Sequence, residues 1–319
     1  MLPEFNPPLA TTHILLTKAR TMPSTIATAP NRRRFLVATA AAALAVSKLE
    51  LTLPAASAAD PKSKMRFGLV TYLWGQSMDL PTVITACEKS GLLGVELRTE
   101  HKHGVEPALS KSERETVRKR FADSPVALVG YGSNADFHSS DPEKVKANIE
   151  LTKRYVQLMA DCGGTGVKVK PNGFVKDVPR EKTIEQIGKS LNEIAAYGQQ
   201  YGQQIRVEVH GSGTSELPVI RDIFQVADHP NVKVCWNSNG EDLKGEGLEA
   251  NFRMVQNRFG DTCHVRELDS TDYPYDQLMK LFRGIDYNGW ILLEARTNPD
   301  DKVAAMIAQR KRFDELIAG

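Results

Sequence analysis

From residue 64 onward, the chain alternates between short apolar runs and longer segments with a single apolar face. The short runs are rich in β-branched side chains, which is the pattern of buried strands. Eight of them are predicted strands: Phe67–Tyr72, Gly94–Arg98, Val126–Tyr131, Gly166–Lys170, Ile205–His210, Val232–Trp236, His264–Leu268 and Trp290–Ala295.

The segments between these runs have the helical period. In residues 141–162 the apolar positions recur on one face, and Asp141 followed by Pro142 suits a helix start, with the aspartate as N-cap. Residues 183–201 repeat the pattern. Glycines follow several of these segments and suit helix ends: Gly91, Gly163, Gly202 and Gly260.

Eight strand-then-helix units predict the α/β class and a (β/α)8 TIM barrel, formed as one domain by residues 60–319. The alternative is an open doubly wound sheet, which carries a glycine-rich phosphate turn after its first strand. Here the first strand runs instead into Thr71-Tyr72-Leu73-Trp74-Gly75. The barrel is therefore the better prediction.

The first 59 residues have a different character. The sequence NRRRFL at 31–36 is a twin-arginine pattern, an apolar run follows over 35–46, and ASA at 56–58 suits cleavage. This run is too short to span a bilayer, which takes about 20 residues. We interpret residues 1–59 as an export signal and expect a periplasmic protein with no stable membrane insertion after the signal is removed.

The charge of the chain bears on its expected partners, and the cysteine spacing bears on metal binding and disulfides. The net charge is +2 and the pI is about 8.2, without a basic cluster beyond the N-terminal segment, so nucleic acid is not an expected partner. The four cysteines lack metal-binding spacing, and we expect buried free thiols. Cys235 and Cys263 lie on consecutive predicted strands, where a disulfide is geometrically conceivable.

Active sites of (β/α)8 barrels form at the carboxyl ends of the strands, and these ends are polar here. Because residues two apart share a face, the valines of 206–210 place Glu208 and His210 inside the barrel. The same rule turns Glu294 inward, with Leu292 beneath it. On strand seven, Val265 argues that His264 and Arg266 are the inward pair; a register slip of one residue would bring in Glu267 instead.

A buried carboxylate is costly unless it is paired. Either glutamate alone is as well explained by a structural ion pair with a lysine or arginine. Glu208 and Glu294 together, aimed into one cavity from strands five and eight, require a cation. Other polar or aromatic groups at strand ends complete the expected site: Tyr72, Trp74, Glu96, Arg98, Lys168, Lys170 and Asn237.

Three short motifs, in this order along the chain, resemble those of the xylose isomerase-like barrels, the sugar phosphate isomerases and epimerases. They are GVELR at 94–98, VEVH at 207–210 and GWILLE at 289–294. The resemblance implies one divalent ion, commonly Mn²⁺, Mg²⁺ or Co²⁺, held by Glu, Asp, His and Glu from strands five to eight. Glu208 and Glu294 match that set, whereas Asn237 stands for the aspartate and Arg266 for the histidine.

Both departures disfavour a metal. Asparagine brings no negative charge, and arginine has no free lone pair and stays protonated. Our hypothesis is that Arg266, assisted by Lys168 or Lys170, replaces the metal as the cation beside the glutamates. A weaker metal site built from Glu208, His210, Asn237 and Glu294 is the alternative.

Since arginine or lysine can also stabilise an oxyanion, the sequence predicts an isomerase or epimerase that abstracts a proton next to a carbonyl of a carbohydrate. Glu208, Glu294 and Arg266 are the expected catalytic residues. A keto-glycoside lyase and a non-catalytic carbohydrate-binding barrel are the alternatives, whereas DNA repair is disfavoured. Expected substrate contacts are Tyr72 and Trp74, which otherwise belong to the core, together with Glu96, Lys170, His210 and Asn237.

Overall fold

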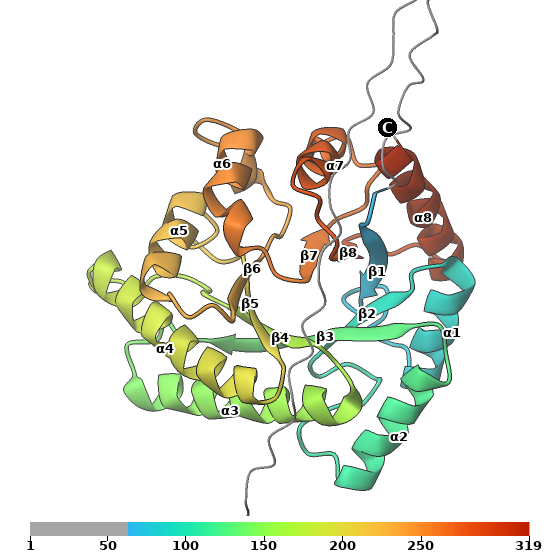
Figure 1. The fold of residues 1–319 in the computed structure, drawn as a ribbon, viewed down its shortest axis with the longest axis horizontal. Helices are drawn as coiled ribbons and strands as arrows, with labels where there is room; N and C mark the ends of the chain where they lie inside the picture. The colour runs from blue at the N-terminus through green and yellow to red at the C-terminus, as the bar shows by residue number, and fades with distance from the viewer. Residues whose placement is uncertain (1–62, 319) are drawn as a thin grey trace, which may run out of the picture. The chain divides into compact units, whose positions relative to one another are not determined.

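The computed structural model describes residues 63–318, so the predicted export signal at 1–59 lies outside the described residues. Eight strands alternate with eight α-helices along this part of the chain (Figure 1). The strands are β1 (Arg66–Val70), β2 (Gly94–Arg98), β3 (Ala127–Asp136), β4 (Gly166–Lys170), β5 (Gln204–Glu208), β6 (Val232–Cys235), β7 (Thr262–Val265) and β8 (Trp290–Leu293). The helices are α1 (Leu80–Ser90), α2 (Lys111–Ala122), α3 (Pro142–Cys162), α4 (Arg180–Gln200), α5 (Leu217–Val226), α6 (Leu248–Val255), α7 (Tyr275–Gly284) and α8 (Lys302–Ala318).

The strands form one parallel sheet in the order β6-β5-β4-β3-β2-β1-β8-β7, which curls until its two edges meet. A parallel bridge between Asn237 and His264 joins the edges just beyond β6. There the His264 N–H donates to the carbonyl of Trp236 at 2.6 Å, and the Ser238 N–H donates to the carbonyl of His264 at 3.1 Å. The predicted (β/α)8 barrel is confirmed.

Helix α3 shows how the local sequence sets these elements. The Asp141 carboxylate accepts a hydrogen bond from the Glu143 N–H, Pro142 occupies the first turn, and Gly163 ends the helix with φ 85°. A left-handed residue at this position is favourable for glycine, which has no Cβ. The helix start and the glycine end predicted from the sequence are both confirmed.

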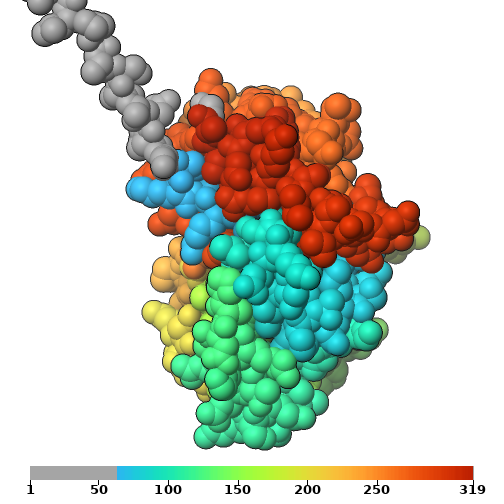
Figure 2. All heavy atoms as spheres, turned by 90° about the vertical axis from the view of Figure 1, so that its right-hand side faces the viewer, coloured from blue at the N-terminus to red at the C-terminus, as the bar shows by residue number. Residues whose placement is uncertain are grey.

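The helices cover the outside of the barrel. Helices α1 and α8, from opposite ends of the described residues, lie side by side and close the ring (Figures 1 and 2). Arg310 of α8 donates to the carbonyl of Gly91, directly after α1, at 3.3 Å. Among the described residues, no helix combines the length and apolar character needed to cross a bilayer.

Each strand has an apolar outer face and a mixed inner face. Outward residues join the large core under the helices, whereas a small separate cluster of Val70, Val129, Trp290 and Leu292 fills the lower barrel interior. Leu292 pairs in register with His264, and the Glu294 N–H bonds to the carbonyl of Val265, so Glu294 lies one step above this apolar layer. The polar layer therefore rests on a mainly apolar floor, which the fully buried Arg206 of β5 also enters.

Several strands end earlier than predicted. Strand β7 stops at Val265 rather than Leu268, and β8 at Leu293 rather than Ala295, because the polar residues beyond leave the ladder at the barrel mouth. Strand β3 is longer than predicted and reaches Asp136, with a register shift against β4 between Gly132 and Asp136. Side-chain direction thus follows strand alternation only as far as these observed ends.

Candidate functional site

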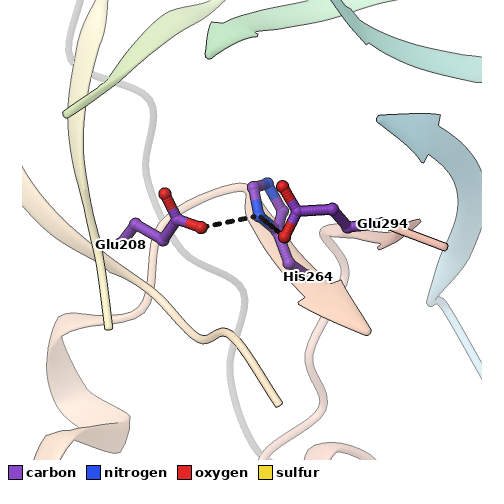
Figure 3. A group of neighbouring side chains, drawn as sticks. All are labelled: Glu208, His264 and Glu294. Carbon is purple, nitrogen blue, oxygen red and sulfur yellow. Dashed lines mark ion pairs between the residues drawn. The ribbon is translucent and has the colours of Figure 1, made fainter. Parts of the chain in front are cut away.

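Glu208, His264 and Glu294 lie together at the carboxyl ends of β5, β7 and β8 (Figure 3). The imidazole Nδ1 is 3.7 Å from Oε1 of Glu208 and 3.8 Å from Oε2 of Glu294. All three side chains are buried, and one ligand atom from each lies within 4.8 Å of the others. The two carboxylates therefore approach one ring nitrogen from two sides.

The second nitrogen of His264 faces a third carboxylate. Its Nε2 lies 3.2 Å from Oε1 of Glu96, which is fully buried on β2. Gly132 on the neighbouring strand makes room for this carboxylate, since a Cβ there would stand 2.9 Å from Glu96 Oε1. A proton on Nε2 facing Glu96 leaves Nδ1 directed at Glu208 and Glu294.

These carboxylates make the imidazole more basic. Burial opposes a charge on His264, but Cys235, Glu96 and Glu208 outweigh it, and the pKa of His264 is raised well above its ordinary value. The surrounding carboxylates thus favour a second proton on the ring. A metal ion binding to Nδ1 would have to displace this proton.

Glu208 is held by two further side chains. The Lys168 ammonium, itself fully buried, lies 2.5 Å from Oε2, and the Asn237 amide donates to Oε1 at 2.8 Å. Burial alone would raise the pKa of Glu208; Lys168 and His264 outweigh it and hold that pKa well below its ordinary range. Glu208 is therefore ionised at neutral pH.

Glu294 has its own cation on the other side of the barrel mouth. Arg98 Nη1 lies 3.1 Å from Oε1 of Glu294, and Arg98 Nη2 donates to the side chain of Asn134 at 3.2 Å. Lys170 donates to the same Asn134 oxygen at 3.5 Å, and the guanidinium carbon of Arg98 lies 5.1 Å from the ring centre of Tyr72. Glu208 and Glu294 thus each use one oxygen for a cation and turn the other toward His264.

This arrangement fits a divalent cation. Glu208 Oε1, His264 Nδ1 and Glu294 Oε2 converge, and Nδ1 is buried without a hydrogen-bond partner among the described residues. Asn237 can add a carbonyl oxygen if its amide rotates. The nitrogen and oxygen donors suit Mn²⁺, Co²⁺ or Zn²⁺ better than a soft ion, but Lys168 and Arg98 already supply positive charge and reduce the affinity expected of the site.

The structure corrects the hypothesis about Arg266. His264, which lies on β7 two residues before Arg266, stands between the glutamates. The Arg266 guanidinium instead faces Asp272 at 3.9 Å, and the backbone N–H of Arg266 donates to the Tyr275 hydroxyl at 3.0 Å. The reason is that β7 ends at Val265, so the inward alternation does not extend to residue 266. The imidazole expected from the resemblance is present, and Asn237 is the one altered position of the set.

The prediction that Trp74 contacts the substrate is also wrong. It is 2% exposed, belongs to the outer core, and donates from Nε1 to the carbonyl of Thr297 at 3.0 Å, so it offers no face to a sugar. Tyr72 is half-buried above the apolar floor. The slipped register is excluded as well, because Glu267 accepts from the N–H groups of Arg296 and Thr297 and ties two loops together.

The remaining predicted contacts stay near the site. Lys170 and His210 are half-buried, and burial, together with nearby Lys168, lowers the pKa of Lys170. Burial likewise lowers the pKa of His210, whose Nδ1 has no hydrogen-bond partner among the described residues. All four cysteines are buried and free, as expected.

Sequence reasoning missed the roles of His264 and Arg98. Alternation had already turned His264 inward, but the histidine of the resembled motif was placed two residues too far along, at Arg266. Arg98 was noted at a strand end without a partner, since its contact with Glu294 spans 196 residues of sequence. The adjacency of β2 and β8 on either side of β1 is the signal that brings the two together.

Comparison with known proteins agrees with this geometry. The xylose isomerase-like TIM barrel family matches residues 84–313. The chain therefore belongs to this family. A search of curated proteins found no match.

Solved structures share the fold at low sequence identity. A 3-keto-D-glucoside 4-epimerase from E. coli superposes with a TM-score of 0.66 at 13% identity, covering 77% of this chain and 98% of its own. An L-ribulose 3-epimerase gives 0.68 at 14% identity, covering 79% and 94%. A probable 3-DHS dehydratase from Bacillus anthracis gives 0.61 at 15% identity, covering 77% and 98%. At such identities these similarities establish the fold.

Proposed function

We propose that this protein is a carbohydrate epimerase or isomerase that removes a proton from the carbon next to a carbonyl group and returns it. The observation that carries the proposal is the pair of buried carboxylates, Glu208 and Glu294, which face one centre from two strands. The epimerase activities named for two structural neighbours support the same class of reaction.

The residues have distinct tasks in this scheme. A carboxylate that is ionised at neutral pH can accept the proton, and the low pKa of Glu208 keeps it in that form. Glu294 faces the same centre from β8 and serves as the second base. Lys168 and Arg98 are cations already fixed beside these carboxylates, where they stabilise the negative charge that develops on the carbonyl oxygen.

A divalent cation, when bound, would act as a Lewis acid that polarises the substrate carbonyl. Glu208, His264 and Glu294 would hold it, with the carbonyl oxygen of Asn237 as a fourth donor, and we propose Mn²⁺ or Co²⁺. Glu96 would fix the His264 ring so that Nδ1 faces the ion.

Elimination is the second candidate, favoured by His210. Its buried Nδ1 lacks a hydrogen-bond partner among the described residues, and the ring lies near Glu208 and Lys170. A hydrogen bond from the His210 ring would stabilise the leaving oxygen, which takes up the proton that Glu208 or Glu294 has removed from the carbon next to the carbonyl. A keto-glycoside would then lose its aglycone, and the twin-arginine pattern leads us to propose that the reaction takes place in the periplasm.

Incubation with candidate sugars in D₂O tests the proposal. The panel holds aldoses, ketoses and keto-glycosides, with and without added Mn²⁺, and mass spectrometry reads the deuterium gained. We expect deuterium at the carbon next to the carbonyl of at least one substrate. Epimerisation retains the glycosidic bond, whereas elimination releases the aglycone. If the protein binds a sugar but no sugar of the panel gains deuterium, the result would contradict the enzyme assignment and favour a carbohydrate-binding barrel.

A further inference from the structure

A hollow of about 490 Å³ lies beside the barrel mouth, between the end of β3 and the start of α3. Such a volume is within the usual range of small-molecule pockets. Its lining is mostly polar and shares no residue with the Glu208–His264–Glu294 centre: Asp136, His138, Ser139, Ser140, Lys144, Ala147, Asn148 and Val175. The hollow therefore needs an explanation of its own.

The strand register places the edge of this hollow nearer the barrel mouth than the layer that holds Glu208. Gly132 of β3 pairs with Lys168, the partner of Glu208, whereas Asp136 pairs with Lys170. Since strands rise about 3.3 Å per residue, Asp136 lies about 6–7 Å further toward the barrel mouth than Lys168. This is a spacing that a molecule longer than one sugar ring can bridge.

Polar side chains lie between the two places. Arg98 contacts Glu294 and also donates to Asn134, which accepts from Lys170 as well. Lys170 pairs in register with Asp136 at the edge of the hollow. Polar groups therefore lie between the Glu208–His264–Glu294 centre and the hollow.

The lining suits hydroxyl groups. Asp136 is fixed by two amides, with Asn172 donating to its carboxylate at 3.0 Å and Asn148 to its carbonyl at 2.8 Å. His138 lies with Nδ1 3.3 Å from the Asp136 carboxylate, yet this nitrogen has no hydrogen-bond partner in residues 63–318. Donors and acceptors thus alternate around the hollow, and the carboxylate disfavours a strongly anionic ligand.

We infer that this hollow is a second sugar subsite, so that the substrate is a glycoside whose second ring binds between β3 and α3 while the reacting ring lies at Glu208 and Glu294. The inference rests on the proposed function for the position of the reacting ring. The Asp136 carboxylate accepts hydrogen bonds from ring hydroxyls, the Ser139 hydroxyl donates or accepts them, and Lys144 and His138 add donors.

Titration calorimetry on the full chain tests the subsite without requiring turnover. The probes are cellobiose and maltose, each compared with the methyl glucoside of the same anomer. We expect at least one disaccharide to bind about tenfold more tightly than its methyl glucoside. The double variant His138→Ala/Lys144→Ala should lose this advantage, whereas the control Lys146→Ala, exposed on the same helix, should keep it.

Three results would overturn the subsite. The first is that each disaccharide and its methyl glucoside bind equally well or not detectably. The second is that the double variant loses affinity for the disaccharide and for the methyl glucoside to the same extent. The third is that inorganic phosphate binds and is lost in the double variant, while disaccharide binding persists. Because calorimetry measures binding and not turnover, its result tests the subsite separately from the proposed function. A disaccharide advantage that disappears in the double variant supports the subsite even if no sugar exchanges deuterium.

Discussion

Replacement of Glu208 by glutamine is expected to lower the rate at which the sugar epimers or isomers interconvert by about 10³-fold, because a neutral amide cannot accept the substrate proton. The same change leaves the Lys168 ammonium buried without its 2.5 Å partner. Breaking a buried ion pair by removing one member costs about 3–5 kcal/mol of stability. Rates and chemical denaturation of the purified variant measure the two effects.

A second replacement separates catalysis from folding. The double variant Glu208→Gln/Lys168→Met removes the isolated cation as well, and replacing both members of a buried pair is often close to neutral for stability. We expect the double variant to regain much of the lost stability while its rate stays as low as that of Glu208→Gln. Activity that returns together with stability would mean that Glu208 serves the fold and not the reaction.

Replacement of His264 by glutamine is expected to reduce activity by at least about 10²-fold, because the ring nitrogen between the two glutamates is lost. Metal content after dialysis against Mn²⁺ should fall in parallel, since His264 is the one nitrogen donor of the converging trio. Steady-state rates and elemental analysis of the same preparations provide both numbers.

Arg266→Gln is the matched control for His264. Arg266 lies two residues further along and contacts Asp272 and Tyr275. We expect its replacement to change activity by less than about threefold, because the half-buried guanidinium pairs with the exposed Asp272 and, among the described residues, with neither glutamate. An Arg266 variant as inactive as the His264 variant would restore the view that an arginine supplies the cation of this site.

The sequence predicted the barrel well because its signals are local and repeated. Strands β2 and β4 were predicted with their observed bounds, and alternation alone turned Glu208 and Glu294 inward. These predictions succeed because a strand with one helix-covered face leaves its residues little freedom of direction. The register argument also placed Leu292 correctly beneath Glu294.

The errors begin where the strands end. Beyond Val265 the chain leaves the ladder, so Arg266 follows its loop and not the alternation. Trp74 similarly follows β1 and turns outward to Thr297, a contact 223 residues away in sequence. The pairing of Arg98 with Glu294 depends on barrel closure, which no local pattern contains. Directions in loops and long-range ion pairs are properties of the assembled barrel.

The placement of two bases on opposite sides of one carbon is the central claim, and proton exchange in the single glutamine variants tests it most directly. Each epimer of the substrate found in the D₂O panel is incubated separately with Glu208→Gln and with Glu294→Gln. We expect each variant to exchange the proton of one epimer, a different one for each variant, and neither to interconvert the epimers. Exchange of both epimers by both variants at the rate of the unaltered protein would contradict the account.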